Sequence, residues 1–175
     1  MIHKIRNKIP KVDSSAFVAW NAEVAGDVII EENVSIWFSA TIRADIAEVY
    51  IGKNSNLQDN AVIHIEENVP CVVENNVTVG HNAILHSCTI KEGSTVGMGA
   101  IVLNNAVIGK NCMVGAGSLV TQGKVFPDNS LILGSPAKLI REMTPEEIEA
   151  MKKNCEHYVI KGQSAKTDYI EITPC

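Results

Sequence analysis

An apolar residue recurs every six positions along most of this chain, and this period restricts the fold more than any other feature of the sequence. Small residues predominate four positions further on, and glycine follows the apolar residue in five hexads. Insertions at 48–50 and 69–72 interrupt the count without ending it, and one position is skipped before Ile90, where the hexad is one residue short. The first positions of the twenty hexads are all apolar: Val12, Val18, Val24, Ile30, Ile36, Ile42, Ile51, Leu57, Ile63, Val73, Val79, Leu85, Ile90, Val96, Val102, Ile108, Val114, Val120, Phe126 and Ile132.

The period of six predicts an all-β solenoid, a parallel β-helix. An apolar residue and a small residue four positions apart point inward from a short strand and from the corner beside it. Three hexads then make one triangular turn, and successive turns stack as parallel strands. We expect glycine at the second position to supply backbone angles that other residues adopt at a cost. Alternation with a period of two would also suit a β-sandwich, but a sandwich does not explain a period of six.

The repeat ends at Gly134-Ser135-Pro136-Ala137, and a helix-start signal follows. Thr144 is suited to the N-cap, with Pro145 at the first helical position and Glu147 completing a capping box. We predict a helix over roughly 145–160, and its apolar face is formed by Ile148, Met151 and Cys155.

One domain is expected from 175 residues. The β-helix, with a short N-terminal lead-in, is assigned to residues 1–143. The helix and the tail, residues 144–175, are expected to pack on the same domain. Within the tail, residues 169–172 have the pattern of a short strand.

Composition argues against nucleic acid and membrane as partners. The net charge is −5, so no basic field favours nucleic acid or an anionic membrane. No apolar stretch approaches the roughly 18 residues that span a bilayer, and the N-terminal residues lack the apolar run of a signal peptide. We therefore expect a cytoplasmic protein. Its five cysteines form no CxxC pair and are predicted to be reduced thiols.

His64 and His86 occupy the same position of hexads that are one full turn apart. The count therefore places them in one column on adjacent turns, about 4.8 Å apart. Two imidazoles at that spacing can share a zinc ion, whose nitrogen ligands lie about 2.0–2.1 Å from the metal. Arg43 precedes His64 in this column if the insertions bulge outward as loops.

His81 is at the third position of its hexad and belongs to a different face. Five extended residues separate it from His86, at most about 16 Å of chain that must also turn a corner. One chain is therefore not expected to bring His81 to the other two histidines, whereas a neighbouring subunit in a three-fold assembly would do so. Asp59 lies one turn before His81, with Gln58 beside it.

Simpler roles stay open for these side chains. A lone histidine is usually a surface or packing residue, and His3 and His157 are interpreted as surface residues. Arg43 and Asp45 would pair as ordinary opposite charges, and Gln58 would fill a corner.

Five segments together resemble the γ-class carbonic anhydrases and their close relatives, over about residues 10–140. The segments are Arg43-Ala44-Asp45, Leu57-Gln58-Asp59-Asn60 leading to His64, Val77-Thr78-Val79-Gly80-His81, Leu85-His86-Ser87-Cys88 and Gly97-Met98-Gly99-Ala100. The resemblance implies a left-handed β-helix that assembles as a homotrimer, with zinc, iron or cobalt at each subunit interface. The implied ligands are His64 and His86 of one chain and His81 of its neighbour.

The resemblance also implies a chemistry and roles for the surrounding residues. Three neutral nitrogens leave an open metal position, where bound water with a pKa of about 7 would attack carbon dioxide and form bicarbonate. Gln58 would orient that water or the bicarbonate, and Arg43 and Asp45 would pair at the interface.

The chain departs from the fast enzymes of that family at two places. Ile46 stands where they carry an acidic residue, and residues 65–72 are short in place of a long acidic loop. Glu67 has the offset from His64 of their proton-shuttling glutamate. Because proton export limits turnover, these departures would permit slow or absent hydration with the fold and the metal intact.

Other functions share this fold. A coenzyme A-dependent acyltransferase would use one histidine as a general base without a metal, and the Gly134-Ser135-Pro136-Ala137 ending also occurs there. A thioesterase would use metal-bound water on a coenzyme A ester. A non-catalytic trimer that retains a metal is the third alternative.

Overall fold

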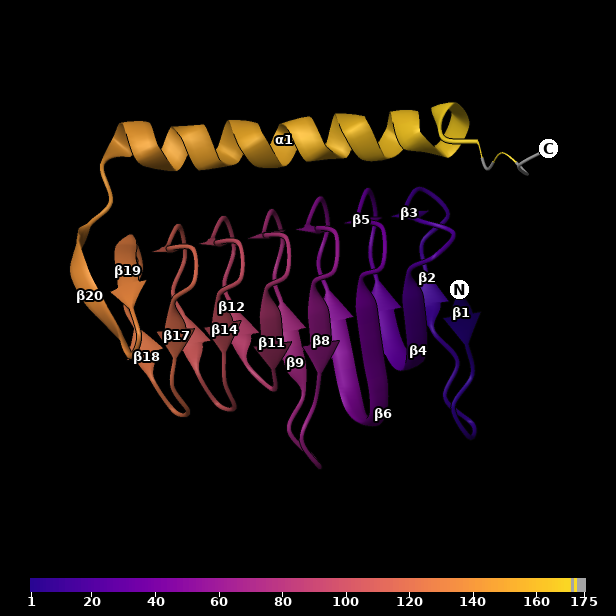
Figure 1. Ribbon diagram of the computed structural model, residues 1–175, viewed down its shortest axis with the longest axis horizontal. Coiled ribbons are helices and arrows are strands. Elements are labelled where there is room, and N and C mark those ends of the chain that lie inside the picture. Colours follow the sequence, from indigo (N-terminus) through magenta and orange to yellow (C-terminus); the bar gives the residue numbers. More distant parts are fainter. Residues whose placement is uncertain (171, 173–175) are drawn as a thin grey trace.

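The computed structural model describes residues 1–170 and 172, and it is a parallel β-helix, as the hexads predict, with the left hand that the resemblance implies. Short strands stack along three faces of a triangular prism, and one helix lies along its length (Figure 1). The first face is an eight-stranded sheet that consists of β3 (Phe17–Val18), β5 (Ser35–Ile36), β7 (Asn56–Leu57), β10 (Thr78–Val79), β13 (Thr95–Val96), β16 (Met113–Val114), β19 (Ser130–Gly134) and the antiparallel β20 (Ala137–Glu142).

The other two faces form one 12-stranded sheet, because the long strands β4 (Glu23–Ile30) and β6 (Thr41–Ile51) run through both. The second face continues with β8 (Val62–His64), β11 (Ile84–His86), β14 (Ile101–Val102) and β17 (Leu119–Val120). The third face continues with β9 (Cys71–Val73), β12 (Thr89–Ile90), β15 (Val107–Ile108) and β18 (Val125–Phe126). At the N-terminal end, β4 pairs with β1 (Ile2–His3) and β2 (Lys11–Val12).

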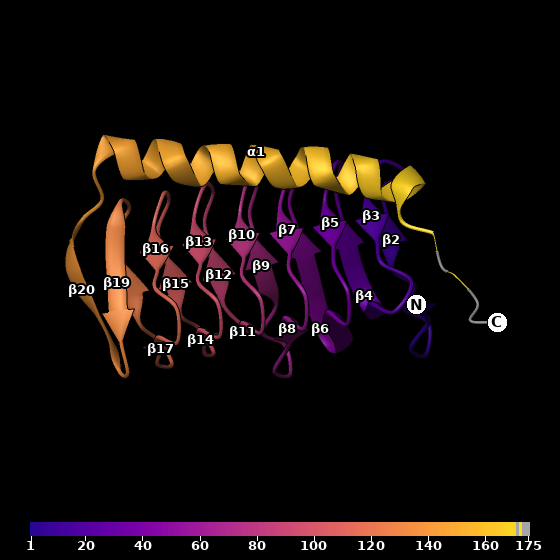
Figure 2. The ribbon, with the colours of Figure 1, turned by 45° about the horizontal axis from the view of Figure 1, so that its top comes forward.

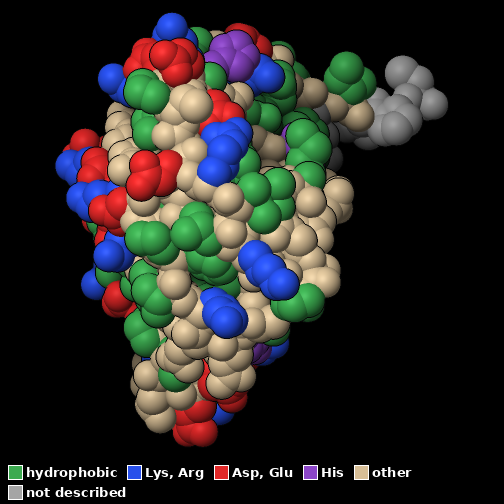
Figure 3. All heavy atoms as spheres, turned by 90° about the vertical axis from the view of Figure 1, so that its left-hand side faces the viewer, with side chains coloured by type: hydrophobic (Ala, Val, Ile, Leu, Met, Phe, Trp, Pro, Cys, Tyr) green, Lys and Arg blue, Asp and Glu red, His purple; other side chains and the backbone are tan. Residues whose placement is uncertain are grey.

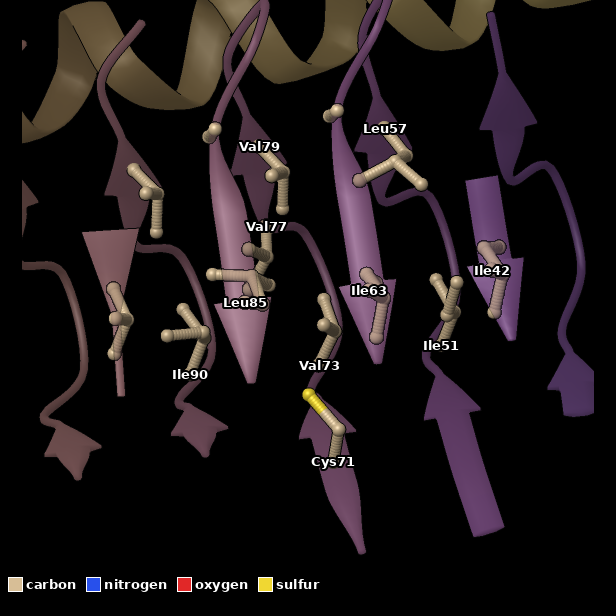
Figure 4. Packing of buried hydrophobic residues seen from close by; sticks show 14 of the residues in the cluster. Ile42, Ile51, Leu57, Ile63, Cys71, Val73, Val77, Val79, Leu85 and Ile90 are labelled. Atoms are coloured by element: carbon tan, nitrogen blue, oxygen red, sulfur yellow. The ribbon is translucent and has the colours of Figure 1, made fainter. Parts of the chain in front are cut away.

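The apolar first positions of the hexads fill the interior of the prism. Ile42, Ile63 and Leu85 are register partners in consecutive turns, and each is fully buried (Figure 4). Alanines at the fifth position, such as Ala61 and Ala83, are buried beside them. Polar functional side chains are therefore confined to the corners and the outer faces.

The corners turn at the fourth hexad position, where the backbone φ is positive. Asparagine, which adopts this conformation more readily than most residues, holds the position in eight hexads: Asn33, Asn54, Asn60, Asn76, Asn82, Asn105, Asn111 and Asn129. The prediction for the second-position glycines was wrong, since none of them has a positive φ: Gly52, Gly80, Gly97, Gly109 and Gly115. They are needed for space, because a Cβ on Gly97 would lie 2.6 Å from the backbone nitrogen of Ala116 in the next turn.

Three departures from the repeat lie beside one corner, between the second and third faces. In β6 the register with β4 shifts so that residues 45–48 lie opposite Asp27 alone, and the three extra residues therefore fall within 45–48 rather than at the predicted 48–50. The second insertion forms a loop between β8 and β9 that projects from the prism (Figure 1). The hexad that begins at Leu85 has only five residues, and within it Ser87 is buried and has a φ of 45°.

The helix α1 (Pro145–Asp168) runs back along the prism from the β20 end toward the N-terminal turns (Figure 2). The predicted capping box is confirmed, with Thr144 as N-cap and reciprocal hydrogen bonds to Glu147. The helix extends eight residues beyond the predicted end at 160, because Gly162 and Ala165 continue its buried face against the prism.

The remaining predictions concern the chain end and the surface. The strand expected at 169–172 is absent at Tyr169 and Ile170, and Glu171 lies outside the described residues. Four cysteines are buried and free, namely Cys71, Cys88, Cys112 and Cys155, and Cys175 also lies outside the described residues. At the β20 end, apolar side chains lie between scattered charges of both signs (Figure 3). Within residues 1–170 and 172, no helix combines the length and the apolar character that crossing a membrane requires.

Candidate metal centre

The strand register confirms the predicted column of Arg43, His64 and His86. Arg43 in β6 is the register partner of His64 in β8, which is in turn the partner of His86 in β11. The two imidazole centroids are 5.1 Å apart, and both rings are partly buried. We call Arg43, Asp45, His64 and His86 the paired-histidine corner.

Hydrogen-bond acceptors fix the tautomers of these two rings. His64 Nε2 lies 3.3 Å from Asp45 Oδ1, and because a carboxylate can only accept, this nitrogen carries the proton. His86 Nδ1 lies 2.7 Å from Asn104 Oδ1, an amide oxygen that can also only accept, so this nitrogen carries the proton. The remaining nitrogens, His64 Nδ1 and His86 Nε2, then face each other as lone pairs 3.1 Å apart.

Two lone pairs at this distance repel each other unless a metal ion or a shared proton lies between them. Tetrahedral zinc would hold two nitrogen ligands about 3.3 Å apart, and the separation of His64 Nδ1 and His86 Nε2 is 3.1 Å. Histidines that bind metals almost always donate their other ring N–H to an acceptor, as both rings do here. The donor set therefore fits a zinc ion.

Burial and charge keep His64 neutral at pH 7. Burial lowers the pKa of His64 most, and the positive charge of Arg43 lowers it further, against the opposing effect of Asp45. Burial raises the pKa of Asp45, but its own backbone N–H, the charge of Arg43 and the contact with His64 together hold that pKa below its usual value. Asp45 also forms an ion pair with Arg43. A neutral imidazole is the form that binds a metal.

His81 lies at a different corner, together with Asp59 and Gln58. Its Nδ1 lies 2.9 Å from Asp59 Oδ2, so Nδ1 carries the proton and Nε2 is left for another partner. Gln58 is buried and donates from Nε2 to Asn56 Oδ1 at 3.2 Å. We call Gln58, Asp59 and His81 the single-histidine corner.

One chain does not bring the two corners together. Among residues 1–170 and 172, no three His, Cys, Asp or Glu side chains lie close enough to hold a metal ion. The roles of His64, His81 and His86 as ligands therefore stay predictions that require a second chain. The roles assigned to the other polar residues of the two corners stay predictions as well.

The structure adds contacts that the sequence pattern did not indicate. Glu67, the predicted proton shuttle, is exposed in the loop after His64. Its neighbour Glu66 accepts a hydrogen bond at Oε2 from Asn104 Nδ2 at 2.7 Å. Counting hexads places a side chain on a corner but does not say which neighbour it reaches, although the five-residue hexad that begins at Leu85 marks this corner as irregular.

A groove of about 580 Å³ lies between α1 and a corner that is lined by Asn54 and Asn76. It includes Cys155 and Lys152 of the helix but no histidine. The candidate metal centre is therefore separate from this groove.

Comparisons with known proteins agree with the fold. Residues 87–122 match the family described as bacterial transferase hexapeptide (six repeats). A carbonic anhydrase of Geobacillus kaustophilus is 44% identical over 175 residues, which cover 100% of this chain and 96% of that protein. The mitochondrial γ carbonic anhydrase 2 of Arabidopsis thaliana is 39% identical over 163 residues, which cover 90% of this chain but only 59% of that protein.

A solved structure from Bacillus cereus, provisionally named an acetyltransferase, matches with a TM-score of 0.94 and 46% identity. The match covers 95% of this chain and 97% of that one. Both kinds of name therefore occur among proteins with this fold and a similar sequence. Because the chain is 44% identical to a carbonic anhydrase over its full length and has the hexapeptide fold, it belongs to the γ-class carbonic anhydrase-like family of hexapeptide-repeat proteins.

Proposed function

We propose that this protein is a metal-dependent carbonic anhydrase that interconverts carbon dioxide and bicarbonate, with zinc held between the subunits of a homotrimer. The ligands are His64 and His86 of one chain and His81 of its neighbour. The observation that carries the proposal is the pair of imidazole lone pairs 3.1 Å apart, which a divalent cation would stabilise. The carbonic anhydrase names of the relatives support it.

The polar residues of the two corners have distinct roles in this proposal. Asp45 and Asp59 accept hydrogen bonds from two of the ligand rings and so hold their orientation. When bound, zinc supplies Lewis acidity that lowers the pKa of a coordinated water to about 7 and provides a nucleophile for carbon dioxide. Gln58 orients the reacting oxygen, and the exposed Glu67 exchanges protons with solvent. Arg43 neutralises Asp45 at the subunit interface.

Elemental analysis of protein purified without oxygen, followed by stopped-flow hydration assays, tests the proposal. We expect about one metal per chain, and hydration that a chelator abolishes and added zinc restores. Metal without hydration would refute the enzymatic assignment and keep the site. An assembled trimer that neither contains nor takes up a metal would refute both.

Mixed trimers test whether a site spans two chains. His81→Ala and His86→Ala should each abolish metal binding, whereas His157→Ala on the exposed side of α1 should not. Random mixing of the two defective chains should restore about one quarter of the sites, because a site is intact where each chain supplies what the other lacks. No recovery in mixed trimers would refute the shared site.

One contact also favours the acyltransferase alternative. The contact between His81 Nδ1 and Asp59 Oδ2, at 2.9 Å, is the arrangement of a general base oriented by a carboxylate. Such an enzyme would transfer acetyl groups from acetyl coenzyme A with its metal removed, and His81→Ala would abolish the transfer. A thioesterase would hydrolyse acetyl coenzyme A only with the metal bound. Neither activity is expected under the proposed function.

A further inference from the structure

We propose that Glu66 and Asn104 are positioning residues that fix the tautomer of His86 and so determine which of its nitrogens is available to a metal. The inference rests on the proposed function only in naming a metal as the partner of His86. It is carried by a closed circuit of contacts at the paired-histidine corner that joins His86, Asn104, Glu66 and Ser87.

Two side-chain hydrogen bonds form the first half of the circuit. His86 Nδ1 lies 2.7 Å from Asn104 Oδ1, and Asn104 Nδ2 donates to Glu66 Oε2 at 2.7 Å. Asn104 belongs to the turn that follows His86, whereas Glu66 belongs to the loop after β8, one turn before it. Three consecutive turns of the prism are therefore linked through one amide.

Ser87 closes the circuit through the backbone. The Glu66 N–H donates to Ser87 Oγ, which in turn donates to the carbonyl oxygen of Val69 at 2.8 Å. Ser87 is 1% exposed, follows His86 directly, and lies in the hexad that is one residue short. Ser87 thus anchors both ends of the loop that carries Glu66.

The donors and acceptors of the circuit can be arranged in only one way, because a carboxylate accepts hydrogen bonds and does not donate them at neutral pH. Asn104 must turn its NH₂ group toward Glu66, and it therefore presents Oδ1 to His86. An oxygen at that place requires the proton on His86 Nδ1, which leaves the lone pair on Nε2, the atom that faces His64. Without the carboxylate, the amide could turn over and donate to Nδ1, and Nε2 would then carry a proton and bind no metal.

Glu66→Gln and the double variant Glu66→Gln/Asn104→Asp provide the test. Glutamine keeps the length of the side chain but can donate as well as accept, so it no longer fixes which way the Asn104 amide turns. The carboxylate introduced by Asn104→Asp accepts from His86 and from the new amide, so the proton is again required on His86 Nδ1. Nitrogen NMR of histidine-labelled, metal-free protein reads the tautomer of His86, and chelator competition measures its zinc affinity.

We expect the Nδ1–H tautomer of His86 in the parent protein and a mixture of tautomers in Glu66→Gln, with zinc affinity about tenfold lower. The double variant should restore both. Glu92→Gln is the matched control, because Glu92 contacts Lys110 at another corner, and it should change neither.

An unchanged tautomer of His86 in Glu66→Gln, or a double variant that does not restore it, would overturn the inference. This outcome is distinct from failure of the proposed function, because the tautomer is read without metal. A parent protein that binds zinc but does not hydrate carbon dioxide would refute the proposed function and leave the positioning role supported.

Discussion

Replacing Ile108 by alanine tests whether the interior of the prism is packed as tightly as the register implies. Ile108 in β15 lies between its register partners Ile90 and Phe126 in the adjacent turns, and it is 0% exposed. The change removes three carbon atoms, each worth about 0.8 kcal/mol of burial, so the transfer cost alone is about 2.4 kcal/mol. Because backbone hydrogen bonds fix the spacing of the turns, the cavity cannot collapse, and the total cost should be about 3–5 kcal/mol.

Denaturant titration followed by circular dichroism measures this loss as a change in the free energy of unfolding. Parent and variant are compared at one protein concentration, since the proposed subunit association would make apparent stability depend on concentration. Val125→Ala is the control, because this side chain points outward and is 68% exposed. It should change stability by less than about 0.5 kcal/mol. A cost below about 1 kcal/mol for Ile108→Ala would refute the account of a rigid, fully packed interior.

Three further changes test the corner, the helix start and the spacing of the turns. Asp45→Asn should lower zinc affinity in a chelator competition about tenfold to hundredfold, or about 1.4–2.7 kcal/mol. The surface change Asp27→Asn should leave the affinity unchanged. A zinc affinity of Asp45→Asn within twofold of the parent would contradict this prediction. Hydrogen bonds from Arg141 and from the N-cap backbone lower the pKa of Glu147 from 4.5 to about 2, so its stabilising effect is complete above pH 4.5 and is lost as the pH falls toward 2. Glu147→Gln should therefore lower the Tm at pH 7, and the difference from the parent should shrink by pH 3; a constant difference would argue against it. Gly97→Ala should lower the free energy of unfolding by about 1–3 kcal/mol, because the new Cβ would lie 2.6 Å from the backbone of the next turn. Thermal unfolding measures this loss, and an unchanged Tm would show that the turns can move apart to make room.

The parts of the fold that depend on a local repeat could be predicted from the sequence. Apolar residues such as Ile63 and Leu85 identify the inward positions, and the residues from Thr144 to Glu147 identify the helix start. The end of the helix could not be predicted, because Gly162 and Ala165 are held in place by the prism rather than by a local stop signal. The role of asparagine was missed although its recurrence at the fourth position was visible, since the expectation of unusual backbone angles was attached to glycine.

The candidate site divides in the same way. The register partners of His64 follow from counting hexads, because a full turn returns a residue to its own column. The contacts of Asn104 and Glu66 could not be obtained by counting, because they depend on the path of a loop and on which way an amide turns. The proposed role of His81 as a shared ligand depends on a second chain, which neither counting nor one chain's geometry supplies.

The irregular hexads provide the chemistry of this corner because a regular repeat cannot. In a regular stack, a side chain at one corner lies directly above its equivalent in the turn below, and it has few other neighbours to reach. The extra residues at 45–48 give Asp45 room to contact both Arg43 and the first histidine of the pair. The loop after β8, held by Ser87 of the shortened hexad, brings a carboxylate to the amide that contacts the second histidine. The regular hexads supply a rigid frame, and the interruptions bring Asp45 to the ring of His64 and Glu66 to the amide that contacts the ring of His86.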